Sequence, residues 1–165
     1  MTASARAGDG GMGRILVLGM GNPILSDDGF GLVVAERLRA ESLPDGVSVT
    51  GSEVAGLRLL ELMRGHDKVV IVDALASGSR SPGEIVRFSG DDFKGGHRYA
   101  SAHSLGIRTV LELGERLGYH MPGEVVAYAV EAADVETFGD QLSPPVAAAV
   151  DQVLALVRRE IGASR

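Results

Sequence analysis

The chain has 165 residues, of which 45% are hydrophobic and only 4% aromatic, and its formal net charge is -6. This length and composition predict one domain with an aliphatic core, and the absence of cysteine excludes disulfides, thiolate metal sites and a thiol nucleophile. The basic residues are scattered, which argues against a nucleic-acid-binding surface, and no apolar run approaches the roughly 20 residues that a membrane-spanning helix needs.

Residues 1–13 are rich in Gly, Ala and Ser and lack the apolar segment of a signal peptide. We therefore expect a disordered tail there, with Met12 as an alternative natural start. A single domain is expected over residues 14–161, and the default expectation is a soluble cytoplasmic protein.

The segment Arg14–Leu38 combines an apolar strand, a glycine turn and an acidic pair, in the sequence RILVLGMGNPILSDDGFGLVVAERL. It superficially resembles a dinucleotide-binding fingerprint, but the third glycine of that motif falls on Ile24, and no Gly-Lys-Ser/Thr follows. Asp27 and Asp28 stand where a helix should begin and would repel a phosphate there. The segment therefore disfavours a phosphate ligand.

The next elements alternate between helix and strand. A helix with an apolar stripe begins near Phe30 and should end near Glu41, before Pro44. The segments that follow are predicted as a short strand, a helix that stops at Gly65, and a strand buried on both faces: Val47–Thr50, Leu57–Arg64 and Lys68–Ala74.

The second half of the sequence contains one strand that should run antiparallel to the others. Only a short turn precedes Glu84–Phe88, too short for a parallel crossover, so this strand should be antiparallel to the others. A polar loop should follow at Gly90–Ala100, then a helix at His103–Leu117 and a strand at Glu124–Val130. The final helix, capped and opened by Ser143-Pro144-Pro145, should run up to Ile161. The order predicts an α/β fold, a three-layer α/β/α sandwich around a mostly parallel sheet.

Three reactive groups should converge in such a fold. Asp28 follows the first strand, Asp73 ends the central strand, and His103 opens a helix. The two strands should be neighbours, so that both carboxylates lie at one edge of the sheet near the switch point. Two carboxylates and a neutral imidazole suit a divalent transition metal.

Each of these residues also has a structural interpretation. Ser26, Asp27 or Asp28 could cap the helix that follows, although a cap needs only one of them. Asp73 would be desolvated at the end of an apolar strand, and it could bond to the amides of a neighbouring loop instead of a cation. His103 could be structural, and His97 in the polar loop is a possible substitute for it.

These residues resemble the hydrogenase maturation endopeptidases, over nearly the whole chain from Arg14 to about Arg158. The most specific match is ILVLGMGNPILSDDGFG. Three shorter motifs follow in the order and spacing of the family: VAG at Val54–Gly56, VIVDA at Val70–Ala74 and SAHSLG at Ser101–Gly106.

The resemblance implies a twisted five-stranded sheet with one antiparallel strand, and an endopeptidase that cuts the C-terminal extension from the large-subunit precursor of a nickel-iron hydrogenase. Asp28, Asp73 and His103 then correspond to the family's metal-contacting residues, although some members have Glu where Asp28 stands. The metal implied is nickel already inserted in the precursor, with no organic cofactor, no nucleic acid and no membrane partner.

The same resemblance makes Asp28 and Asp73 the candidate catalytic residues of an aspartic-type or metal-assisted hydrolase, with a carboxylate or the metal activating the water. The sequence has no Gly-x-Ser-x-Gly elbow and no His-Glu-x-x-His motif. Two other functions stay open: a non-catalytic nickel-binding assembly factor, and a different hydrolase with its own bound metal.

Overall fold

The computed structural model describes residues 13–53, 56–93 and 106–162, apart from the side chain of Asp91. Five strands form one sheet in the order β2-β1-β3-β5-β4. β1 lies between β2 and β3, both of which are parallel to it, and β3 is parallel to β5. β4 is antiparallel to β5, as the short preceding turn predicts.

Helices and strands alternate along the first part of the chain. The strands are β1 (Ile15–Met20), β2 (Val47–Ser52), β3 (Lys68–Leu75), β4 (Ile85–Ser89) and β5 (Glu124–Glu131). The helices are α1 (Phe30–Arg39), α2 (Leu57–Met63), α3 (Ile107–Arg116) and α4 (Pro144–Glu160), with short 3-10 helices η1 (Ser26–Gly29) and η2 (Gly90–Phe93). None of the described helices combines the length and apolar character that a membrane crossing requires.

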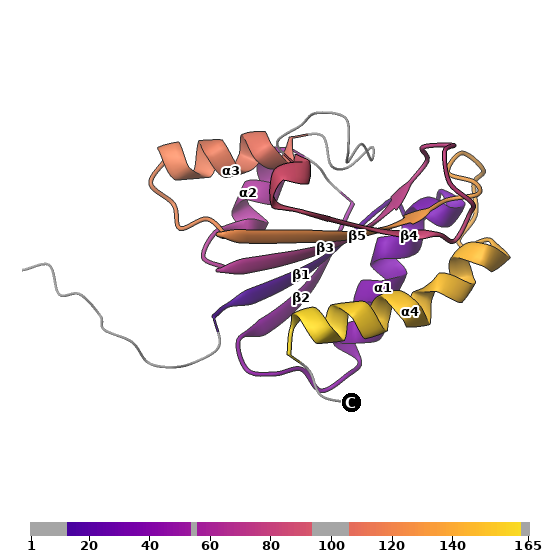
Figure 1. Ribbon diagram of the computed structural model, residues 1–165, viewed down its shortest axis with the longest axis horizontal. Coiled ribbons are helices and arrows are strands. Elements are labelled where there is room, and N and C mark those ends of the chain that lie inside the picture. The colour runs from indigo at the N-terminus through magenta and orange to yellow at the C-terminus, as the bar shows by residue number, and fades with distance from the viewer. Residues whose placement is uncertain (1–12, 54–55, 94–105, 163–165) are drawn as a thin grey trace, which may run out of the picture.

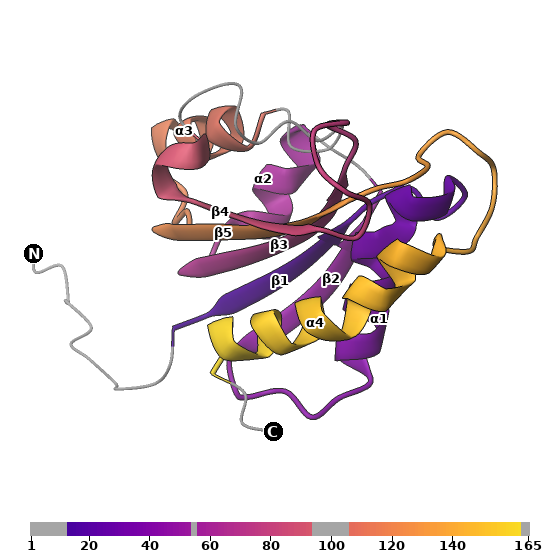
Figure 2. The same cartoon turned by 45° about the vertical axis from the view of Figure 1, so that its right-hand side comes forward.

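The sheet is the middle layer of three, as Figures 1 and 2 show. α1 and α4 cover one face, and α2 and α3 cover the other. The parallel strands β1 and β3 are buried along nearly their whole length, which explains why their sequences are continuous apolar runs rather than alternating patterns. The predicted α/β/α architecture is confirmed.

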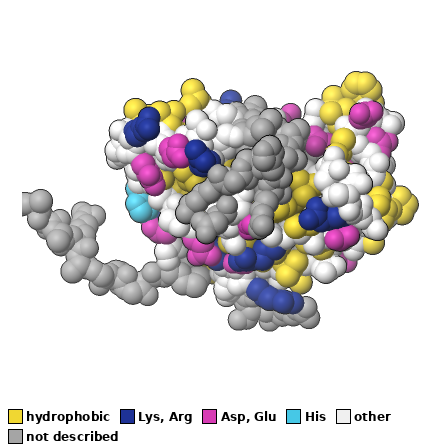
Figure 3. Space-filling view, turned by 45° about the horizontal axis from the view of Figure 1, so that its top comes forward, with side chains coloured by type: hydrophobic (Ala, Val, Ile, Leu, Met, Phe, Trp, Pro, Cys, Tyr) yellow, Lys and Arg dark blue, Asp and Glu magenta, His cyan; other side chains and the backbone are white. Residues whose placement is uncertain are grey.

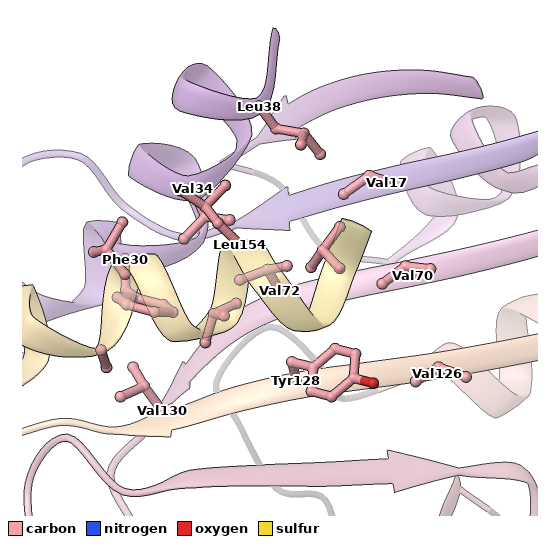
Figure 4. Packing of buried hydrophobic residues seen from close by; sticks show 14 of the residues in the cluster. Val17, Phe30, Val34, Leu38, Val70, Val72, Val126, Tyr128, Val130 and Leu154 are labelled. Carbon is pink, nitrogen blue, oxygen red and sulfur yellow. The ribbon is translucent and has the colours of Figure 1, made fainter. Parts of the chain in front are cut away.

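Each face of the sheet has its own hydrophobic core. Figure 4 shows the core beneath α1 and α4, where Phe30 and Val34 pack with Leu154 over the side chains of Val72 and Val130. Leu16, Leu18 and Ile71 point to the other face and pack with Leu60 and Val110 beneath α2 and α3. Alternate residues of each strand therefore serve opposite cores.

Element boundaries differ from the prediction at two places that bear on the site. β3 extends to Leu75, so Asp73 lies within the strand rather than at its end. α3 begins at Ile107 rather than at His103, because Gly106 has φ +106°, a left-handed conformation that interrupts a right-handed helix. The predicted tail over residues 1–13, apart from Gly13, and the second half of the polar loop at Gly90–Ala100 lie outside the described residues.

Candidate functional site

The glycines of the first motif let backbone segments approach one another. Gly21 has φ +156°, and a β-carbon there would lie 2.0 Å from the carbonyl oxygen of Asp28. A β-carbon on Gly31 would lie 2.2 Å from the carbonyl oxygen of Val72. Any side chain at either position would push η1 or α1 away from the sheet. These glycines therefore bring the acidic pair close to β1 and β3, which agrees with the sequence argument against a phosphate loop.

Asp28 lies in η1, directly after β1, and is 8% exposed. Its backbone N–H donates to the carbonyl of Leu25 at 2.9 Å, and its carboxylate oxygen Oδ2 accepts a hydrogen bond from the N–H of Asn22 at 3.1 Å. The turn between β1 and η1 thus fixes both the backbone and the carboxylate of Asp28.

Asp73 is fully buried in β3, whose other residues after Lys68 are apolar. Its Oδ1 accepts a hydrogen bond from the N–H of Ala74 at 2.8 Å. Because Val72 and Ala74 belong to the core under α1 and α4, the alternation of the strand directs Asp73 toward the opposite face. A fully buried carboxylate within a strand at the switch point is a candidate for function.

The two aspartates share one edge of the sheet. Pairing between β1 and β3 ends at Gly19 and Val72, so the chain leaves β1 for η1 where Asp73 follows on β3. This boundary is the topological switch point of a sheet with this strand order. The expectation that the neighbouring strands β1 and β3 bring both acids to one edge agrees with this topology.

The third predicted ligand, His103, lies outside the described residues, as does its substitute His97. Within the ranges that the structure does describe, no three His, Asp or Glu side chains are grouped so that they could hold a metal ion. The proposed metal contact of Asp28, Asp73 and His103 therefore stays a prediction.

Asp27, the other member of the acidic pair, has a different environment. It is fully buried, and its carboxylate accepts four hydrogen bonds from the loop between β5 and α4. The donors are the N–H groups of Ala133, Asp134 and Ser143 and the hydroxyl of Ser143, at 2.7 to 3.0 Å. Asp27 therefore joins η1 to a loop more than a hundred residues away in sequence.

Ser143 is the N-cap residue of α4, as predicted, but neither its hydroxyl nor the side chains of Ser26, Asp27 and Asp28 form the capping hydrogen bonds considered from the sequence. No described side chain forms a capping hydrogen bond at η1, α1 or α4. The carboxylate of Asp27 is taken up by the β5–α4 loop, and the hydroxyl of Ser143 donates to Asp27 instead of capping α4. The Pro-Pro opening of α4 is confirmed, with the prolines at its first positions.

A further buried carboxylate at this edge, Glu131 at the end of β5, also has structural partners. It accepts hydrogen bonds from the hydroxyl of Ser77 and the N–H of Gly78, both at 2.8 Å. These bonds hold the turn between β3 and β4. Glu131 could not be singled out from the sequence, because its partners Ser77 and Gly78 follow a different strand.

Two large apolar side chains are exposed beside η1. Ile24 is 56% exposed and Phe138 is 79% exposed. Their loops are held together by the N–H of Gly139, which donates to the carbonyl of Ile24 at 3.0 Å, and by a bridge between Leu25 and Gly139. Hydrophobic side chains are visible at the right-hand end of the molecule in Figure 3, where the β5–α4 loop lies. Such exposure is typical of a surface that contacts another protein.

The chain is similar to proteins that act in hydrogenase assembly. Residues 32–160 match the family model described as hydrogenase maturation protease. The hydrogenase 2 maturation protease of Escherichia coli is 32% identical over 151 residues, which cover 88% of this chain and 91% of that protein. The hydrogenase expression/formation protein HupD of Rhodobacter capsulatus is 31% identical over 153 residues, covering 91% of this chain and 72% of that protein.

Solved structures agree with these matches. The hydrogenase maturating endopeptidase HybD from E. coli has a TM-score of 0.77 and 31% sequence identity, and the match covers 90% of this chain and 94% of that one. The nickel-iron hydrogenase maturation protease HybD from Thermococcus kodakarensis has a TM-score of 0.71 and 29% identity, covering 90% and 99%.

Proposed function

The chain belongs to the hydrogenase maturation protease family, and from that membership we propose that it is an endopeptidase acting on the large-subunit precursor of a nickel-iron hydrogenase. It removes the precursor's C-terminal extension after nickel has been inserted, as the last step of maturation. The enzyme needs no organic cofactor, and its nickel is supplied by the substrate. A cytoplasmic location stays a prediction from the sequence.

The observation that carries the proposal is the position of two buried aspartates at the switch point. Asp28 and Asp73 are placed there by the turn after β1 and by β3, in a family whose members are proteases. Asp27 and Glu131, the other buried acids at this edge, hold the β5–α4 loop and the turn between β3 and β4. Asp28 and Asp73 stand at the two positions that the resemblance to the family assigns to its acidic residues, and we assign the function to them.

In the proposed reaction, Asp28, Asp73 and His103 contact the nickel of the precursor. Carboxylate and imidazole ligands suit a borderline divalent metal such as nickel. Contact with the metal positions the adjacent peptide bond of the precursor at the same edge of the sheet. A precursor without nickel would lack these contacts, so only the loaded form would be cut.

Cleavage itself is a hydrolysis. Water adds to the carbonyl carbon of the scissile peptide bond, the carbon–nitrogen bond breaks, and the new amine takes a proton. Either a carboxylate of the pair accepts the proton of the attacking water, or the metal lowers the pKa of that water.

The exposed pair Ile24 and Phe138 supports a folded protein as the substrate. The two side chains flank η1, and burying them would require an apolar surface larger than a peptide side chain offers. The large subunit around its nickel site is the surface we assign to them.

The test compares the wild-type chain with Asp73→Asn, using nickel-loaded precursor and its intact mass. The variant should fold with an unchanged circular dichroism spectrum and release no C-terminal peptide. Ser89→Ala, on the strand β4 at the opposite side of the sheet, serves as a control and should process normally. Processing by Asp73→Asn at the wild-type rate would contradict the site assignment.

The intact mass of the precursor and the metal content of the purified chain separate the two other functions. Binding of the nickel-loaded precursor without any loss of mass would indicate a non-catalytic assembly factor. Stoichiometric metal in the purified chain, retained after dialysis, would indicate a hydrolase with its own metal.

A further inference from the structure

A hollow of about 520 Å³ lies along the outer edge of β2, at the end of the strand that is nearest the site. Its walls are Leu32 and Arg39 of α1 and Arg58 of α2, and its floor is the end of β2 at Gly51 and Ser52. We call it the β2 slot. α1 and α2 cover opposite faces of the sheet (Figures 1 and 2). Because residues of both helices line the slot, it lies between them at the sheet edge.

The outer edge of β2 presents backbone groups to this slot that no described strand pairs with. Among the described strands, β2 has only β1 as a neighbour. The carbonyls of Gly46 and Ser52 accept hydrogen bonds from Ile15 and Gly21, so alternate residues of β2 face β1. The intervening residues Val49 and Gly51 therefore direct their N–H and C=O groups outward. An edge of this kind is a template for an added strand.

Two cations line the slot. Within the described part of the chain, neither Arg39 nor Arg58 forms an ion pair or a hydrogen bond. By contrast, Arg37 of α1 pairs with Asp151, and Arg64, directly after α2, pairs with Glu61. Glu53 is the single acid in the lining, which leaves the slot with a local charge of about +1 on a chain of net charge -6.

Gly51 lets the side chains of α1 approach the backbone of β2, because it has no side chain of its own. A β-carbon at this position would lie 3.1 Å from the side chain of Leu32 and 3.3 Å from the guanidinium of Arg39. The guanidinium therefore lies over the backbone of β2, where a carboxylate on an added strand could form a charge-assisted hydrogen bond with it.

We propose that the β2 slot binds the C-terminal extension of the precursor as an added strand, with acidic side chains of the extension held by Arg39 and Arg58. This inference rests on the proposed function, because it assigns the slot to the same substrate. The slot adds affinity for the segment that will be removed, while Asp28 and Asp73 recognise the metal.

The topology sets the direction of the bound segment. β2 runs toward the edge that carries Asp28, so a segment that starts at the site and follows β2 away from it must be antiparallel to β2. Two strand spacings of about 4.8 Å separate β1 from the slot, a distance that roughly three extended residues span. The acidic side chains should therefore lie within the first few residues after the cleaved bond.

The binding test uses a synthetic peptide covering the C-terminal residues of the large-subunit precursor, amidated so that only its side chains carry negative charge. A second peptide has Asn and Gln in place of Asp and Glu. The acidic peptide should bind the wild-type chain at least about tenfold more tightly than the neutral one. The double variant Arg39→Gln/Arg58→Gln should bind both peptides equally weakly, which completes a double-mutant cycle.

Amide hydrogen exchange measured by NMR distinguishes strand addition from a purely electrostatic interaction with the two arginines. The acidic peptide should slow exchange at the N–H groups of Val49 and Gly51, which face outward. Those of Ser48 and Thr50, which face β1, should be unchanged. Loss of affinity without this pattern of protection would contradict strand addition.

Processing of the nickel-loaded precursor separates this proposal from the proposed function. Arg39→Gln/Arg58→Gln should raise KM at least about tenfold and leave kcat within about twofold. The matched control Arg116→Gln/Arg159→Gln removes two exposed charges elsewhere, for which the described residues offer no ion pair, and should change neither constant. Normal KM in the slot variant, or an extension without acidic residues, would overturn the slot while the protease function stands. Peptide binding with the predicted protection but no cleavage would support the slot and overturn the protease function.

Discussion

Charged groups at the two ends of the sheet find different kinds of partner: they are partly exposed at the amino end and buried at the carboxyl end. At the amino end, Glu160 of α4 contacts Lys68 at 2.7 Å, Arg87 at 3.2 Å and the hydroxyl of Tyr128 at 2.7 Å. At the carboxyl end, the described donors to Asp27 are backbone N–H groups and one hydroxyl. Opposite charges at the amino end satisfy each other within the chain.

This difference assigns separate tasks to the two ends. The amino-end network joins α4 to β3, β4 and β5, so its loss should affect stability alone. At the carboxyl end, Asp27 holds the loops in place, and the neighbouring Asp28 is assigned to the substrate. Substitution of Asp27 should therefore lower stability, whereas substitution of the adjacent Asp28 should lower processing.

The largest effect is expected from Asp28→Asn. The substitution keeps the size of the side chain and an oxygen that can accept from the N–H of Asn22, but removes the charge that would contact nickel. Processing should fall at least about a hundredfold, because a metal contact is lost. Thermal unfolding followed by circular dichroism should change by no more than a few degrees. Near-normal processing would contradict the assignment of Asp28.

Asp27→Ala should instead act on stability. It leaves three backbone N–H groups and one hydroxyl of the β5–α4 loop without their acceptor. The free energy of unfolding should fall by about 3 kcal/mol, since each buried unsatisfied donor is costly. Urea denaturation measures this value. A stable Asp27→Ala variant that had lost all processing would show that the two neighbouring acids do not have separate tasks.

Much of this arrangement could be predicted from the sequence, for identifiable reasons. The apolar runs before Gly19 and Asp73 indicate adjacent buried strands, which places Asp28 and Asp73 at one edge. The task of Asp27 could not be predicted, because its donors begin 106 residues later in a loop without a motif. The start of α3 was also missed, since the left-handed Gly106 stands inside a helical apolar pattern.

At the amino end, Glu160→Gln should cost about 1–2 kcal/mol in the free energy of unfolding and leave processing unchanged. Burial opposes ionisation of Glu160, but hydrogen bonds from Lys68 and Tyr128 outweigh it and lower the pKa of this carboxyl below 4.5. The ionised carboxylate of Glu160 therefore contributes to the free energy of unfolding above its unfolded-state pKa. This contribution is lost as the pH falls through the lower folded-state pKa.

Urea denaturation of the wild-type chain and Glu160→Gln from pH 7 to pH 3 checks this dependence. The difference in unfolding free energy should be constant near neutral pH and shrink below about pH 4.5. A difference that grew on acidification would show that the carboxylate is destabilised in the folded chain.

The smallest effect is expected from Phe138→Ser, at the exposed surface beside η1. Because the side chain is 79% exposed, the midpoint of thermal unfolding should stay the same. KM for the folded precursor should rise about three- to tenfold, the loss of one apolar contact at an interface. Leu117→Ser, 57% exposed beyond the end of α3, is the matched control and should not change KM. Equal effects of both substitutions would remove the case for a docking surface at Phe138.

The most direct test of the central claim is the intact mass of a large-subunit precursor after incubation with the wild-type chain, with and without inserted nickel. If Asp28 and Asp73 recognise the metal, a C-terminal peptide will be lost from the nickel-loaded precursor alone. Equal loss from both forms, or loss from neither while the loaded precursor binds, would contradict nickel-gated cleavage.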